Sequence, residues 1–196
     1  MASALVFILI AGYWIYRSAP QRRKTPFIFY SSFVLMIGGI GGSLYHGFRN
    51  SSLTLLMDWL PILLLVLASA VYFLKFSTGS WKPSVLAVLL LLTLESINWT
   101  FAPTRLNNNI SYTLMAIMVL IPTFLVLKKV KFTGWRNILF AFTAFTLALI
   151  FRIYDRDGLL PMGTHFLWHG FGAVATFFMF RFVWKLEQKS ALIPSS

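Results

Sequence analysis

Long apolar runs separated by short polar breaks recur along the whole chain of 196 residues. A run of about 17 to 25 mainly apolar residues is long enough to cross the hydrocarbon core of a bilayer as an α-helix. We therefore expect an all-α, polytopic membrane protein with one seven-helix transmembrane domain over residues 1–196. The predicted spans cover residues 2–16, 26–48, 53–75, 83–101, 110–128, 134–152 and 160–184.

The first predicted span, residues 2–16, is the shortest, and its length also fits the apolar part of a signal peptide. No charged residue precedes it, and no small-residue cleavage pattern follows it. We therefore interpret it as a membrane span. The connections between spans are short and leave no room for a water-soluble domain, so we expect any chemistry within the membrane or at its surface.

The basic residues are distributed unevenly between the two ends of the predicted spans. Hydrophobic residues make up 58% of the chain and charged residues 11%, yet the net charge is +12. The positive-inside rule explains this charge without a nucleic-acid partner, and it predicts an outer or lumenal N-terminus and a cytoplasmic C-terminus. Thirteen basic residues lie on the predicted cytoplasmic side: Arg17, Arg22, Arg23, Lys24, Lys75, Lys82, Lys128, Lys129, Lys131, Arg136, Arg181, Lys185 and Lys189. Four lie on the other side: Arg49, Arg105, Arg152 and Arg156.

Ionisable side chains inside spans are costly unless they are paired or bind an ion, so each is a candidate for function. The predicted topology brings four of them to one depth, in the outer half of the bilayer: His46, Asp58, His165 and His169. The chain has no cysteine, which excludes disulfides, thiolate metal sites and cysteine nucleophiles.

The three histidines of the chain form a candidate metal site. His165 and His169 are four residues apart and share one helical face, with a rise of roughly 6 Å between them. His46, from another helix, completes a set of three imidazoles, and three imidazoles with one open position are a known catalytic zinc arrangement. The alternative is that each histidine binds a backbone group or a lipid headgroup.

Ser43 and Glu95 have two interpretations each, whereas the loop aspartates and the glycines of the second span have one. Ser43 lies three residues before His46, where its hydroxyl either reaches the metal-bound water or substrate, or bonds the carbonyl one turn back. Glu95 either lines a headgroup pocket or pairs with another buried polar group. Asp155 and Asp157 lie in a loop and are interpreted as solvated charges. Four glycines indicate close helix packing: Gly38, Gly39, Gly41 and Gly42.

Three separated motifs resemble the CREST superfamily of seven-span membrane hydrolases, which includes the alkaline ceramidases and the progestin and adipoQ receptors. The stretch GGSLYHG is similar to the serine and histidine motif of the second span. MDWLP resembles the D-x-L-P segment of the alkaline ceramidases, and HFLWHGFGA resembles their H-x-x-W-H stretch. The residues of this chain that match the motifs are Ser43, His46, Asp58, Pro61, His165, Trp168 and His169.

This resemblance implies a zinc site in which His46, His165 and His169 bind Zn²⁺, Asp58 contacts the metal-bound water and Ser43 completes the site. The chain departs from the family in two respects. The family serine stands four residues before the first histidine, whereas Ser43 stands three before His46. The acidic N-terminal segment that binds calcium in the animal ceramidases is absent, so we do not expect calcium activation.

We therefore predict a zinc-dependent hydrolase of membrane lipids, closest to the alkaline ceramidases, that cleaves the amide bond of a ceramide-like N-acyl lipid. Metal-activated water is expected to attack the carbonyl, with Asp58 as general base and Ser43 or the zinc ion at the oxyanion. The alternatives are a receptor or lipid-binding protein with a structural zinc, an ester-cleaving lipase of the same superfamily and, with less support, a transporter. No cysteine or fourth histidine is present to close the zinc site, which favours catalysis.

Overall fold

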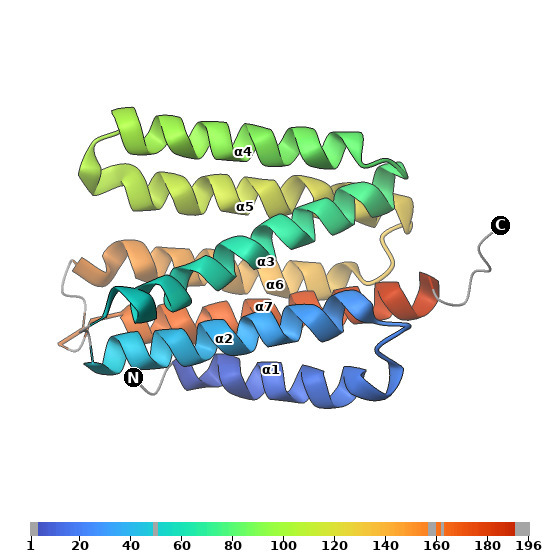
Figure 1. Cartoon of the computed structure of the whole chain (residues 1–196), viewed down its shortest axis with the longest axis horizontal. Helices are drawn as coiled ribbons and strands as arrows, with labels where there is room; N and C mark the ends of the chain where they lie inside the picture. Colours follow the sequence, from blue (N-terminus) through green and yellow to red (C-terminus); the bar gives the residue numbers. More distant parts are fainter. Residues whose placement is uncertain (1–3, 49–50, 157–159, 162, 191–196) are drawn as a thin grey trace. The chain divides into compact units, whose positions relative to one another are not determined.

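The computed structural model of the protein describes residues 4–48, 51–156, 160–161 and 163–190. This part of the chain is built of seven α-helices and two short 3₁₀ turns, and no strand occurs in it (Figure 1). The α-helices are α1 (Leu5–Ser18), α2 (Pro26–Phe48), α3 (Ser52–Thr78), α4 (Lys82–Phe101), α5 (Thr104–Lys129), α6 (Trp135–Ile153) and α7 (His165–Ser190). The turns are η2 (Ala19–Gln21) and η3 (Tyr154–Arg156). The all-α prediction is confirmed.

Six helices within the described residues, α2 to α7, are long and apolar enough to cross a membrane. Their surfaces fit such an environment, because large apolar side chains such as Leu86 and Phe101 are 69% and 79% exposed. Apolar surface of this extent is stable in lipid and is unfavourable in water. The chain is therefore an integral, multi-pass, α-helical membrane protein.

The helix α1 has 14 residues, which rise about 21 Å, less than the hydrocarbon core of about 30 Å. It does not meet the length of a span, so the expected seventh crossing stays a prediction, as does the orientation of the termini. The last helix also begins later than expected, at His165 instead of residue 160. Gly163, with φ of +74°, has a left-handed backbone that a helix does not accommodate.

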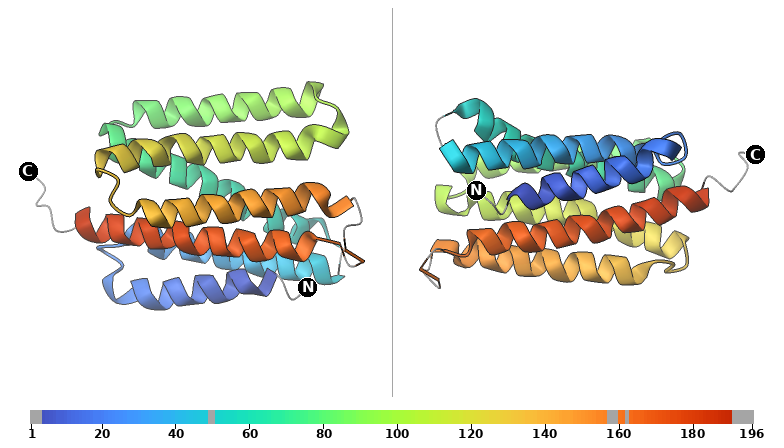
Figure 2. Two further views of the ribbon diagram at one scale, coloured as in Figure 1. Left: turned by 180° about the vertical axis from the view of Figure 1, so that it is seen from behind. Right: turned by 90° about the horizontal axis from the view of Figure 1, so that it is seen from below.

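The chain divides into two compact units, and we describe each by itself. The first unit comprises Met1–Ile62 and Gly134–Ser196, and thus α1, α2, the start of α3, α6 and α7. Within it, α1 packs against α2 and α7, and α6 packs along α7 (Figures 1 and 2). The ring of Trp14 is buried between α1 and α7, where it contacts Phe177, Phe180 and Trp184.

One face of α2 is made of glycines, and it brings α3 into close contact. A Cβ atom at Gly38 would lie 3.1 Å from Pro61 Cβ, and one at Gly41 would collide with the backbone of Met57. Gly39 faces the other way, where a Cβ would lie 2.8 Å from Ile8 Cγ1 of α1. The expected close packing at these glycines is confirmed, and it allows the second turn of α3 to lie directly against the end of α2.

The opposite end of α2 is bound to α7 by a buried carboxylate. Glu187 accepts hydrogen bonds from the backbone N–H groups of Phe27 (2.8 Å) and Ile28 (3.2 Å), in the first turn of α2. The N–H groups of a first helical turn have no partner within the helix, and negative charge is favourable there. Glu187 therefore caps α2 from a distant part of the chain.

The second unit, Leu63–Thr133, contains the rest of α3 and the hairpin of α4 and α5. Ala70, Leu91 and Met118 form its buried apolar core. Glu95 accepts a hydrogen bond of 2.6 Å from the hydroxyl of Ser111, so it pairs with a polar group of α5. This is the second of the two roles expected for Glu95.

Candidate metal centre

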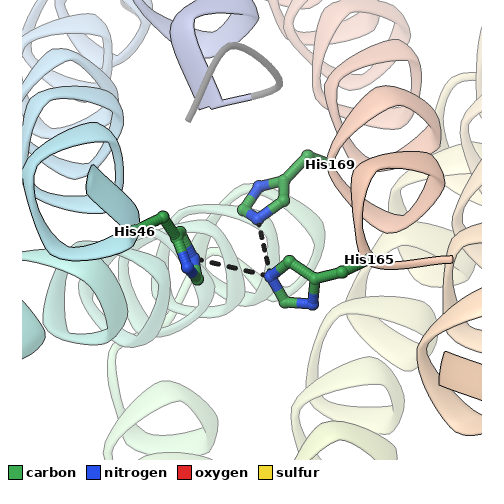
Figure 3. A group of neighbouring side chains, drawn as sticks. All are labelled: His46, His165 and His169. Atoms are coloured by element: carbon green, nitrogen blue, oxygen red, sulfur yellow. Dashed lines mark hydrogen bonds between the residues drawn. The ribbon is translucent and has the colours of Figure 1, made fainter. Parts of the chain in front are cut away.

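The three histidines come from the ends of two helices of the first unit. His46 lies in the last turn of α2, while His165 begins α7 and His169 follows one turn later. All three rings turn the Nε2 atom towards a common point (Figure 3). The Nε2 atom of His165 lies 3.0 Å from that of His169 and 3.5 Å from that of His46.

These separations fit a metal ion. Two nitrogen ligands of a tetrahedral zinc ion at about 2.0–2.1 Å stand roughly 3.3–3.4 Å apart. The two measured distances lie on either side of this value, and one ligand atom from each ring lies within 4.8 Å of the others. The rings also meet edge to face, with centroids 4.7 to 5.2 Å apart, so each can point a nitrogen at one ion without stacking on its neighbours. The donor set therefore matches a three-imidazole site.

The histidine cluster is partly buried. His169 is only 7% exposed, and its ring meets the edge of Phe7 from α1 at 6.1 Å. His46 and His165 are half-buried, so the cluster has one buried side and one accessible side. Exclusion of water from one side strengthens electrostatic interactions with a bound ion.

Asp58 lies beside the cluster, on the second turn of α3. Its Oδ2 atom is 3.7 Å from the Nε2 atom of His46, the same nitrogen that faces His165. The other oxygen, Oδ1, occupies the space that a side chain at Gly42 would need, because a Cβ there would lie 2.6 Å away. The carboxylate thus lies at the face of the cluster towards which the ring nitrogens point.

Ser43 is engaged elsewhere. Its hydroxyl donates a hydrogen bond of 2.7 Å to the carbonyl of Gly39, one turn earlier in α2. This is the more common state of a serine in a membrane helix, and it was one of the two interpretations of the sequence. Since a hydroxyl has one proton, Ser43 cannot donate to a substrate oxygen without breaking this bond.

Asp155 is part of the site, which corrects the expectation that it is a solvated loop charge. Its Oδ2 atom lies 3.6 Å from Nδ1 of His165, and its Oδ1 atom accepts a hydrogen bond of 2.7 Å from the N–H of Thr164. The contact spans a loop, so no helical periodicity in the sequence indicates it. Asp157, which was interpreted in the same way, lies outside the described residues.

Two other predicted residues have packing contacts. The ring of Trp168 lies 6.4 Å from that of Phe145 in α6, and Pro61 packs against Gly38.

A cavity of about 420 Å³ lies at the other end of α7, lined by Arg136, Phe178 and Lys185 among others, and it does not include the histidines.

The fold and this cluster together define a class: an α-helical, multi-pass membrane protein with three converging histidines and two neighbouring carboxylates. Comparisons of the chain with families of known proteins, with curated protein sequences and with solved structures give no match. A function is therefore argued from the residues of the site and their geometry.

Proposed function

We propose that the protein is a zinc-dependent hydrolase that cleaves the amide bond of a ceramide-like N-acyl lipid within the membrane, and that it is related to the alkaline ceramidase branch of the CREST superfamily. The observation that carries this proposal is the convergence of three imidazole Nε2 atoms beside the carboxylate of Asp58. Three imidazoles leave one position of a tetrahedral ion open, as catalytic zinc sites require.

In this proposal the residues divide the work of hydrolysis. His46, His165 and His169 would hold the zinc ion as neutral imidazoles, and the bound ion would supply an activated water with a pKa near 7 and a Lewis acid for the carbonyl oxygen. Asp58 takes a proton from the attacking water and returns it to the leaving amine. A C–O bond forms as the C–N bond breaks, and the products are a fatty acid and a free sphingoid amine.

Ser43 is not assigned to the oxyanion, because its hydroxyl donates its one proton to the backbone carbonyl of Gly39. The proposed substrate is a lipid, because the helices that carry the site expose large apolar side chains such as Leu53 and Phe166, along which a lipid can approach from the bilayer. By the charge distribution, the site lies in the outer or lumenal half of the bilayer.

The substitution Asp58→Asn tests the division of roles. Asparagine keeps the size of the side chain but cannot accept the proton, so zinc content and melting temperature should stay at the parent values while hydrolysis falls about 100-fold or more. The measurements are zinc per protein, thermal unfolding and turnover of an N-acyl sphingoid lipid and of a matched ester lipid, on one preparation with and without a chelator.

The matched control is Glu95→Gln, the same change of carboxylate to amide in another membrane helix, where Ser111 is the partner. It should leave both zinc content and turnover at the parent values. Equal turnover per zinc in Asp58→Asn would remove Asp58 from the chemistry. A parent protein that binds zinc but cleaves neither amide nor ester lipids would favour a receptor or lipid-binding protein.

A further inference from the structure

A second carboxylate, that of Asp155, lies beside the histidine cluster, near the ring of His165, whereas Asp58 lies near the ring of His46. It is carried by η3, the turn that follows α6, and it reaches the first residues of α7. Each of its oxygens has a different neighbour: Oδ1 accepts from the N–H of Thr164 at 2.7 Å, and Oδ2 lies 3.6 Å from Nδ1 of His165. The carboxylate therefore connects the end of α6 to a histidine of the site.

The local backbone holds this carboxylate in place. Gly163 has φ of +74°, and a Cβ atom there would lie 2.9 Å from Asp155 Oδ1, so both the conformation and the space call for glycine. Thr164 is only 1% exposed, and its hydroxyl donates to the carbonyl of Phe151 at 2.5 Å. Gly163 and Thr164 thus fix the position of the Asp155 carboxylate at the start of α7.

The two carboxylates face different nitrogens. Asp58 lies by an Nε2 atom, on the side of the rings where the three nitrogens converge. Asp155 lies by an Nδ1 atom, on the outer side of His165. A neutral imidazole carries its proton on one nitrogen, and a carboxylate at Nδ1 holds the proton there. The lone pair is then on Nε2, which is the atom that faces His46 and His169.

We propose that Asp155 is a positioning residue of the metal centre: it accepts the Nδ1–H of His165 and so holds the Nε2 lone pair towards the ion. The 3.6 Å separation is longer than a hydrogen bond, and the proposal requires the two atoms to come within about 3 Å of each other in the zinc form. This inference rests on the proposed metal centre and is independent of whether the reaction is hydrolysis. Partners of this kind typically account for 10- to 100-fold in metal affinity.

The substitution Asp155→Asn separates positioning from a purely structural role. The asparagine oxygen can still accept from Thr164, so the start of α7 keeps its cap. Its amide N–H₂, however, would face Nδ1 of His165 and favour the tautomer with the proton on Nε2, which is a poor ligand. We expect zinc affinity to fall 10- to 100-fold, measured by competition with a chromophoric chelator, while the melting temperature of the zinc-free protein stays at the parent value.

Three further variants serve as controls. Thr164→Val removes the hydroxyl bond to the Phe151 carbonyl and a long contact of 3.5 Å to Asp155 Oδ1, but it leaves the carboxylate and its 2.7 Å bond from the N–H of residue 164. It should therefore lower the melting temperature with zinc affinity within about twofold of the parent. Glu95→Gln, a carboxylate-to-amide change in the second unit, should alter neither quantity. Asp155→Glu retains a carboxylate and should restore part of the affinity that asparagine loses.

NMR of the parent protein with ¹⁵N-labelled histidine provides a test that does not depend on the folding of a variant. In the zinc form, His165 should be protonated at Nδ1 and bound to the ion through Nε2. Zinc bound through Nδ1 of His165, or a parent affinity that persists in Asp155→Asn, would overturn the inference and leave the metal centre intact. A parent protein that binds no zinc would overturn both.

Discussion

The substitution Gly42→Ala would move one carboxylate oxygen of Asp58, the proposed general base, and almost nothing else. A Cβ atom at this position would lie 2.6 Å from Oδ1 of Asp58, whereas ordinary van der Waals contact begins at 3.4 Å, so the oxygen has to retreat by at least 0.8 Å. The next nearest atoms, Asp58 Cγ at 3.6 Å and Ala4 Cβ at 3.7 Å, are already at contact distance. The new methyl group therefore displaces the end of a flexible side chain and leaves the helices in place.

The energetic consequences of this change differ for the fold and for the chemistry. Alanine is favoured over glycine in a helix by about 1 kcal/mol, which offsets the cost of turning the carboxylate. Displacement of a reacting group by about 1 Å, in contrast, can lower a rate about 100-fold. We expect Gly42→Ala to keep the zinc content and melting temperature of the parent and to lose about 100-fold in lipid hydrolysis.

Gly12→Ala is the matched control, because a Cβ there would meet Met36 Cε at 3.9 Å, an ordinary contact. It should have parent turnover and equal or greater stability. Parent turnover in Gly42→Ala would refute the role of Asp58 as positioned by the glycine face of α2. A loss of zinc or of stability would show that the methyl group separates α2 from α3 rather than turning the carboxylate.

Three further predictions concern other parts of the chain. Ser43→Ala should reduce hydrolysis less than tenfold, because its proton is held within α2; a loss as large as that of Asp58→Asn would assign it to the oxyanion. Glu187→Leu should destabilise the protein by about 1–3 kcal/mol, since two backbone N–H groups lose their acceptor, and a parent melting temperature would show that water replaces it. Cysteines at Asn108 and Lys129, at opposite ends of α5, should be labelled from opposite sides of the membrane; labelling from the same side would contradict the topology.

The helices and the histidine cluster are the parts of the molecule that the sequence predicts best. Apolar runs determine where helices form in lipid, and the i, i+4 spacing of His165 and His169 determines their common face. The predicted start of α7 was wrong by five residues. The helix begins after Gly163, whose left-handed backbone cannot be recognised from hydropathy.

The contacts of Asp155 and Glu187 with residues far along the chain could not be predicted from the sequence in the same way. Asp155 and Glu187 lie next to charged or polar residues in the sequence, as solvated carboxylates usually do. Their partners are a histidine ring reached through a loop, and two backbone groups about 160 residues away. Contacts of this kind depend on tertiary packing and leave no periodic pattern in one chain.

The carboxylate cap of Glu187 has a consequence for which changes the chain tolerates. Ile28 precedes His46 by 18 residues, and His169 precedes Glu187 by 18 residues, so two antiparallel helices measure the same rise of about 27 Å between cap and cluster. One residue inserted into either interval would shift the imidazole by about 1.5 Å and rotate it by about 100° relative to its partners. Apart from the histidines and the closely packed glycines of α2, these two helices are thus more tolerant of substitution than of a change in length: related chains should differ here by substitution, with gaps confined to the loops.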